Sequence, residues 1–175
     1  MKKLLVSASA LVALAVTATP AHAAPATSDA TATVRVLRAL QLAAEQNLNL
    51  QTIVLSGPAG FAATVGVDQN GNPDCDGNSG DVTCSGIMTP ATYRVIGAND
   101  QTVSINVAST LALENQTDNT APDLTLDVDA PTEVELGPNG STDGVTFNIG
   151  GSVDVTDSTV DGVYVGEFAV EADYQ

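Results

Sequence analysis

The sequence predicts an all-β fold, and in particular an antiparallel β-sandwich, from two observations. Apolar and polar residues alternate along many short segments, a pattern that buries one face of a strand and leaves the other in water. Asn-Gly and Asp-Gly pairs lie between these segments and supply the positive φ angles that tight hairpins need. Many short strands at this spacing are typical of a sandwich or a barrel, and we expect the sandwich.

The alternating segments follow one another from residue 61 onward. They cover residues 61–67, 93–95, 103–107, 124–128, 145–149 and 153–155. The turn pairs are Asn70-Gly71, Asp76-Gly77, Asn139-Gly140, Asp143-Gly144 and Asp161-Gly162. We therefore expect a succession of strands joined by tight turns.

Residues 34–50 fit two different structures. A helical face would contain Leu37, Leu40, Ala44 and Leu48, and both Ala and Leu favour helices. Strands would instead pair Val34 with Val36, and Leu40 with Leu42. Because the flanking segments alternate, we expect strands joined by a bend or bulge, with a short helix as the alternative.

A secretory signal is expected at residues 1–23. Lys2 and Lys3 precede a mostly apolar run over residues 4–18, and Ala21 and Ala23 are the small residues that a signal peptidase recognises. The run is shorter than the about 20 apolar residues of a membrane span, so we expect cleavage after Ala23 and no later membrane insertion. The remaining chain would then have an extension over residues 24–33 and a single domain over residues 34–175. Its expected location is the periplasm, the outer cell surface or an extracellular filament.

The composition after residue 23 excludes several classes of function. Three basic residues remain against 21 acidic ones, a formal net charge of −18, which repels nucleic acid and anionic lipid surfaces. No His and no Lys remain to act as the base that a Ser or Cys nucleophile needs. Pairs of carboxylates could hydrolyse glycosides, but the chain is poor in the aromatic residues that bind sugars. We therefore expect no enzyme and no catalytic residue.

Two cysteines are expected to form a structural disulfide. Cys75 and Cys84 lie nine positions apart in a segment rich in Asn, Gly and Asp, where a bond would clip a hairpin. Closing a loop of about ten residues contributes roughly 2.5–3 kcal/mol in a chain-entropy estimate. A redox role is not expected, because the spacing is not Cys-x-x-Cys and no basic residue lies nearby.

The acidic segment over residues 68–81 has two interpretations. Calcium loops place oxygen ligands at every second residue, and the best set here is Asp74, Asp76, Asn78 and Asp81. The bidentate glutamate that usually completes such a loop is missing, and Asn, Gly and Asp are also the ordinary residues of turns. We favour a solvated turn and keep calcium as the alternative; no other cofactor is expected.

Both ends of the chain after residue 23 alternate. Small and apolar residues share one parity on the N-terminal side, at Ala26, Ser28, Ala30, Ala32, Val34 and Val36. Glycine, aromatic and apolar residues share one parity on the C-terminal side, at Gly162, Tyr164, Gly166, Phe168, Val170, Ala172 and Tyr174. We expect the C-terminal segment to be a strand, which needs a neighbouring strand for its backbone groups.

Five blocks, in this order, resemble a family of secreted bacterial proteins, the domain of unknown function 4402. They are residues 48–54 (LNLQTIV), 91–97 (ATYRVIG), 103–105 (VSI), 147–153 (FNIGGSV) and 162–170 (GVYVGEFAV). The resemblance implies a pilin-type subunit with an immunoglobulin-like sandwich. The C-terminal strand is similar to that of chaperone–usher pilins, whose glycine fourteenth from the end and penultimate aromatic residue correspond to Gly162 and Tyr174.

Two hypotheses of function follow. The leading one is an exported structural or adhesive surface subunit, pilus-like, in which residues 26–36 of one subunit pair with an exposed strand edge of the next. Its partners would be copies of itself or related surface subunits, and the resemblance also allows a periplasmic chaperone. The alternative is a monomeric binding module of the periplasm or cell surface, stabilised by calcium at residues 68–81.

Overall fold

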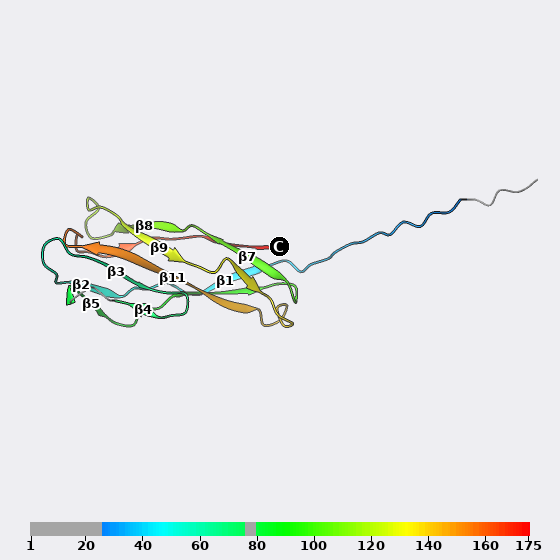
Figure 1. The fold of residues 1–175 in the computed structure, drawn as a ribbon, viewed down its shortest axis with the longest axis horizontal. Coiled ribbons are helices and arrows are strands. Elements are labelled where there is room, and N and C mark those ends of the chain that lie inside the picture. Colours follow the sequence, from blue (N-terminus) through cyan, green and yellow to red (C-terminus); the bar gives the residue numbers. More distant parts are fainter. Residues whose placement is uncertain (1–25, 76–79) are drawn as a thin grey trace, which may run out of the picture. The chain divides into compact units, whose positions relative to one another are not determined.

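A computed structural model describes residues 26–75 and 80–175, and Figure 1 shows strands joined by turns and loops. In these residues every strand pairing is antiparallel and no α-helix occurs. The expected all-β, antiparallel architecture is therefore confirmed, whereas the signal expected at residues 1–23 lies outside the described residues. The chain divides after Arg35 into two units, and all the strands belong to the second.

The strands are short, with one exception at residues 145–156. In chain order they are β1 (Gln41–Gln46), β2 (Thr52–Leu55), β3 (Ala62–Val67), β4 (Pro73–Asp74), β5 (Val82–Ser85), β6 (Ala91–Ile96), β7 (Thr102–Val107), β8 (Thr110–Asn115), β9 (Leu124–Asp129), β10 (Glu133–Glu135), β11 (Val145–Thr156), β12 (Tyr164–Val165) and β13 (Val170–Tyr174). Every alternating segment predicted from residue 61 onward lies in or beside one of them.

The strands form three hydrogen-bonded sheets. The largest has the order β1-β6-β11-β9-β8-β12, and β3 pairs with β11 and carries β4. The second has the order β10-β7-β13, and the third contains only β2 and β5. Strands that follow one another in sequence thus often pair with distant partners, so most of the fold depends on long-range contacts.

Strand β11 joins the two ends of the largest sheet. Its first half pairs with β6, from Val145 to Ile149, and its second half pairs with both β3 and β9. The sequence predicted two separate strands here, and this was wrong because Gly150 continues the strand. A Cβ atom on Gly150 would lie 2.3 Å from the carbonyl oxygen of Val67, so only glycine allows β3 to approach so closely.

The ambiguous residues 34–50 contain a strand and no helix. Strand β1 pairs with β6 in a register that shifts between Ala44 and Gln46, which is a bulge at Glu45. The bulged Glu45 forms an ion pair with Arg94 of β6, with 2.6 Å between Oε1 and Nε. The expectation of a strand with a bulge is therefore confirmed from Gln41 onward.

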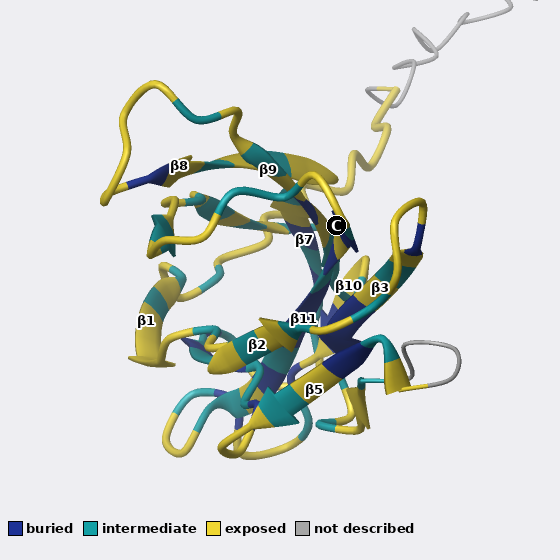
Figure 2. Ribbon diagram, turned by 90° about the vertical axis from the view of Figure 1, so that its left-hand side faces the viewer, coloured by how far each residue is buried: buried dark blue, intermediate teal, exposed yellow. Residues whose placement is uncertain are grey.

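Buried apolar side chains form two clusters. One contains Phe61, Val65, Val67, Val82, Met88, Leu126, Val153 and Val155. The other contains Ala91, Val95, Val103, Ile105, Val134, Leu136, Phe147 and Ile149. Figure 2 shows the buried colour concentrated on β11, which contributes to both clusters, while β1 and β2 are mainly intermediate or exposed.

Candidate functional site: an apolar groove between two strand edges

Two segments at opposite ends of the domain sequence each lack a pairing partner on one side. The N-terminal wall, residues 40–57, contains β1 and β2, and the C-terminal wall, residues 157–173, contains β12 and most of β13. In the described part of the chain β1 pairs only with β6, β2 only with β5, β12 only with β8, and β13 only with β7. Each wall therefore has an edge of backbone groups without a partner strand.

Two hollows lie between these walls, and together they are called the groove here. The wide hollow has a volume of about 1520 Å³ and runs along residues 47–57 on one side and residues 157–168 on the other. The narrow hollow has a volume of about 460 Å³ and lies between Leu40 and Leu42 on one side and Val170 to Asp173 on the other. The walls run in opposite directions, since residue numbers rise along one as they fall along the other.

Apolar side chains that would be buried in a closed domain line the wide hollow. The large ones that remain only half-buried there include Leu48, Leu50, Ile53, Leu55, Leu111, Leu113, Leu124, Tyr164 and Phe168. Apolar residues also continue onto its rim, where Val54, Val163 and Val165 are exposed. Contiguous exposed apolar surface of this kind marks sites of interaction, so the groove is the candidate binding site of the domain.

An aromatic pair lies on the inner side of the wide hollow. Tyr93 lines the hollow and stacks on Phe147, with 5.7 Å between the ring centroids and 19° between the ring planes. Burial raises the pKa of the Tyr93 hydroxyl above its ordinary value of 10.0. This part of the groove therefore offers an uncharged aromatic surface to an occupant.

The C-terminal wall follows the predicted alternation but not as one strand. Tyr164, Phe168, Val170, Ala172 and Tyr174 are half-buried and the residues between them exposed, as expected. The predicted continuous strand is wrong, because residues 166–169 separate β12 from β13 where the pairing partner changes from β8 to β7. A Cβ atom on Gly166 would lie 2.7 Å from the carbonyl oxygen of Ala112, so a glycine is needed at this crossing.

Gly162 lies within the C-terminal wall, next to a buried polar side chain. Its φ of +152° lies in a region that favours glycine, and a Cβ atom would lie 2.3 Å from Oδ1 of Asn115. Asn115, which is 4% exposed, donates from Nδ2 to the carbonyl oxygen of Asp161 and accepts from the backbone N–H groups of Thr117 and Asp118. Gly162 thus has a role within the domain, apart from the assembly role predicted for it.

Tyr174 directly follows the C-terminal wall and contacts the chain just before the N-terminal wall. Its hydroxyl donates to the carbonyl oxygen of Arg38 at 2.6 Å and accepts from the backbone N–H of Ala98, also at 2.6 Å. A Cβ atom on Gly97 would lie 2.5 Å from this hydroxyl, so the side chain fits closely. Tyr174 therefore fixes the narrow end of the groove.

The predicted donor residues form no strand within this chain. Residues 26–40 carry no regular secondary structure, and Ala26, Ser28, Ala30 and Ala32 are exposed. Val34 and Val36 are 83% and 84% exposed, an unusual state for such residues. Their predicted pairing with another subunit stays a prediction.

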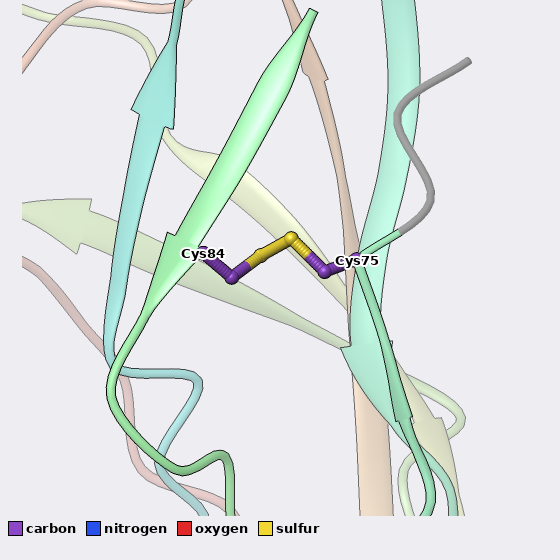
Figure 3. The surroundings of a disulfide bond; sticks show 2 residues. All are labelled: Cys75 and Cys84. Atoms are coloured by element: carbon purple, nitrogen blue, oxygen red, sulfur yellow. A yellow bond between two sulfur atoms is a disulfide. The ribbon is translucent and has the colours of Figure 1, made fainter. Parts of the chain in front are cut away.

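The predicted disulfide is present, and both cysteines pack against the apolar cluster that contains Phe61. Figure 3 shows Cys84 of β5 bonded to Cys75, which follows β4, with 6.1 Å between their Cα atoms. Since β4 pairs with β3 and β5 pairs with β2, the bond joins two strand pairs and does not clip a hairpin as predicted. Ile53, directly opposite Cys84 in the β2–β5 ladder, lines the wide hollow, so the disulfide supports the N-terminal wall.

Residues 68–72 of the acidic segment form a turn, and Pro73 and Asp74 form β4. The Asp68 carboxylate accepts hydrogen bonds from the backbone and side-chain nitrogens of Asn70 and Asn72, and these bonds lower its pKa below 3.8. Of the four candidate calcium ligands, Asp76 and Asn78 lie outside the described residues. Asp74 is exposed in β4, and Asp81 accepts the backbone N–H of Ser56 with its carbonyl oxygen at 2.8 Å. Among the described residues, no three His, Cys, Asp or Glu side chains are grouped to hold a metal.

The N-terminal wall is the part of the site that was missed in the sequence. Its inward-facing side chains are Leu40, Leu42, Leu48, Leu50, Ile53 and Leu55. The parity changes between Leu50 and Ile53, where Gln51 has a positive φ of 61°, so no single alternation runs through the wall. The available signal was the leucine alternation at residues 48 and 50, which was noted only as part of a resemblance.

The described residues form an all-β domain with a candidate binding groove, which is partly lined by apolar side chains and flanked by unpaired strand edges. Over residues 40–174 the chain matches the family described as Domain of unknown function (DUF4402). It belongs to this family, as the sequence blocks predicted, and the match includes both walls of the groove. No curated protein and no solved structure matches the chain. In the described part of the chain, no helix has the length and apolar character of a membrane span.

Proposed function

We propose that this protein is an exported, non-enzymatic structural or adhesive surface subunit of the pilus type, assembled by β-strand addition. In this proposal the domain is an immunoglobulin-like sandwich with one strand missing, and residues 26–36 of a second subunit supply that strand. The proposal is supported above all by one observation: two unpaired strand edges flank an apolar groove. An extended peptide in such a groove gains main-chain hydrogen bonds and buries alternate side chains.

The half-buried side chains support a missing strand. Large apolar residues from both walls, such as Leu50, Ile53 and Phe168, face the wide hollow and remain partly exposed. Burying apolar surface contributes about 25 cal/mol per Å², so a chain that covers this hollow gains substantial free energy.

The N-terminal extension supports the identity of the donor. Residues 26–36 alternate in the manner of a strand, yet they form none within this chain, and both valines are exposed. The polar parity carries Thr27, Asp29, Thr31, Thr33 and Arg35, which suits the solvent side of an inserted strand. The secretory signal expected at residues 1–23 and the disulfide are consistent with a function outside the cytoplasm.

Removal of residues 24–33 tests the proposal. Gently sheared cells that produce the whole chain are expected to release filaments that bind an antibody against the domain in electron microscopy. Cells that produce the truncated chain are expected to release only single particles. A matched control replaces Thr27, Thr31 and Thr33 with Ser, which keeps the length and the apolar parity, and should form filaments. Filaments from the truncated chain would contradict the proposal.

A further inference from the structure

We propose that the contact between Tyr174 and Arg38 commits the N-terminal extension to a second copy of the chain. The contact fixes the backbone at residue 38. It thereby opposes the reversal of chain direction that would place the extension in the groove of its own domain. This inference rests on the proposed function, because it assumes that the groove accepts residues 26–36. It adds the reason why the accepted strand comes from a neighbour.

Residue 38 is held at two points. Its carbonyl oxygen accepts the Tyr174 hydroxyl at 2.6 Å, and its guanidinium donates to the carbonyl oxygen of Ser141. Ser141 is itself anchored, since its backbone N–H donates to Oδ1 of Asn99 at 2.8 Å. The backbone is therefore fixed two residues after Val36, at the place where the extension joins the domain.

The surroundings of the Tyr174 side chain keep its hydroxyl in position to bind the carbonyl oxygen of Arg38. Its hydroxyl accepts the Ala98 N–H while donating to Arg38, so both of its hydrogen-bonding roles are used. Gly97 leaves no space for the ring to move, because even a Cβ atom there would lie 2.5 Å from the hydroxyl and 2.7 Å from Leu40 and Leu136. Such a closely packed contact, in which the half-buried tyrosine has both hydrogen-bonding roles filled, resists rearrangement.

An extension lying in its own groove would have to reverse direction between Val36 and Gln41. It would run antiparallel to β1, because a parallel neighbour requires a crossover of a dozen or more residues. Two-residue hairpin turns need positive φ angles, which Gly, Asn and Asp supply. The residues available are Leu37, Arg38, Ala39 and Leu40, and none of them has a positive φ.

A second copy needs no such reversal. Eleven residues in strand conformation span about 36 Å, so residues 26–36 can lie along the six residues of β1 in a neighbouring domain and continue toward β2. The extension can then leave its own domain without breaking the contacts at residue 38. The occupant of the groove is therefore the extension of another copy.

The test compares the oligomeric state and amide exchange of four purified chains that begin at Ala24, the fourth being Tyr174→Phe alone. The first is the wild type, and the second carries Arg38→Asn, Ala39→Gly and Tyr174→Phe, which install a hairpin turn and remove the hydroxyl. The third is Ala39→Gln, a control that changes the same loop without adding a turn residue. Light scattering over a concentration series gives the oligomeric state, and hydrogen exchange reports the extension amides.

The wild type and the control are expected to assemble as concentration rises, with extension amides protected only in the assemblies. The triple variant is expected to stay monomeric, with its extension amides exchanging at least about tenfold more slowly than in the wild-type monomer. Tyr174→Phe alone keeps the ring and should raise the monomer fraction at least about threefold.

Two results would overturn the inference. One is a triple variant that assembles as the wild type does. The other is a wild-type monomer whose extension is protected regardless of dilution, which would mean insertion into its own groove. Failure of the proposed function is a separate result: the chain lacking residues 24–33 would then assemble as well as the whole one.

Discussion

One polar side chain, that of Asn115, positions the backbone of the C-terminal wall near Asp161 and Gly162. Asn115 is buried and uses both atoms of its amide, so that the chain at Asp161 and the chain at Thr117 are held on one side chain. Gly162 fits against that amide because it has no Cβ atom. A substitution at residue 115 therefore leaves several backbone groups without their partner, in addition to the contact that it removes.

Replacing Asn115 by Ala is expected to lower the free energy of unfolding by about 1–3 kcal/mol, the cost of leaving buried polar groups unsatisfied. Urea denaturation should show a lower midpoint with an unchanged slope. Asn115→Asp keeps the acceptor for Thr117 and Asp118 but loses the donor to Asp161, and should have a smaller effect. Equal midpoints for Asn115→Ala and the wild type would show that the amide does not hold the wall.

Two exposed carboxylates give the stability of the domain a dependence on acid pH. Hydrogen bonds from Asn72 and Asn70 lower the pKa of Asp68, and those from the side chain and backbone of Thr120 lower the pKa of Asp118. Because the folded pKa lies below the ordinary value of 3.8, the stabilisation is complete above 3.8. It is lost as pH falls through the lowered pKa.

Asp68→Ala with Asp118→Ala should therefore make the melting temperature less dependent on pH below 3.8. The difference from the wild type should shrink as the pH falls, because the protonated wild-type carboxyls no longer provide the interaction. Asn72→Ala should reproduce part of the effect by removing the donor to Asp68. Parallel melting curves for all three proteins from neutral to acid pH would contradict this prediction.

At the scale of elements, the β2–β5 pair is attached to the rest of the domain in an unusual way. Its ladder runs only between these two strands, and the Cys75–Cys84 bond connects it to the segment that follows β4. Ile53 and Leu55 of β2 face the wide hollow. The position of the N-terminal wall thus depends on packing and on one covalent link.

Cys75→Ser with Cys84→Ser is expected to lower the free energy of unfolding by roughly 2.5–3 kcal/mol, the estimate for a loop of this length. Amide exchange in β2 and β5 should accelerate more than exchange in β11, because only the smaller pair loses its covalent link. Guanidinium denaturation and hydrogen exchange measure the two effects. Uniform acceleration in all strands would mean that the disulfide stabilises the domain without holding the wall.

Local pattern predicted most of the strands but not the groove. Alternation identified β3, β6, β7 and β9, because each has one buried face. It failed at two glycines that allow the backbone of a distant segment to approach closely. Gly150 continues β11 because β3 packs closely against it, and Gly166 interrupts the C-terminal strand because the carbonyl oxygen of Ala112 lies against it. The groove brings residues 40–57 beside residues 157–173, a separation that no local pattern reports.

At the scale of the whole molecule, the charge and the small extension residues affect how subunits associate. A net charge of −18 after residue 23 opposes association, so assembly must rely on apolar burial and backbone hydrogen bonds. The donor parity offers mainly Ala and Ser to a hollow of about 1520 Å³. Small side chains fill such a space poorly, so we expect the joint of the proposed assembly to be of limited strength.

Ala30→Val with Ala32→Val should consequently strengthen assembly. Each buried methylene contributes about 0.8 kcal/mol, so the added groups should lower the dissociation constant at least about tenfold. Thr31→Val, on the opposite parity, enlarges the solvent side of the strand and should change it little. Dilution of preformed assemblies followed by light scattering measures the effect, and an equal effect of all three substitutions would argue against parity-specific insertion.

The positions of the arginines allow trypsin cleavage to show whether the extension is engaged with another subunit. From Ala24 onward the chain has no lysine, and its arginines are Arg35, Arg38 and Arg94. Arg94 lies in β6, between β1 and β11, and is paired with Glu45, whereas Arg35 lies in exposed chain without regular structure. Trypsin, which cleaves after lysine and arginine, should therefore trim free subunits to a stable domain and spare subunits whose extension is engaged. A small shift on a gel would count the joined subunits directly.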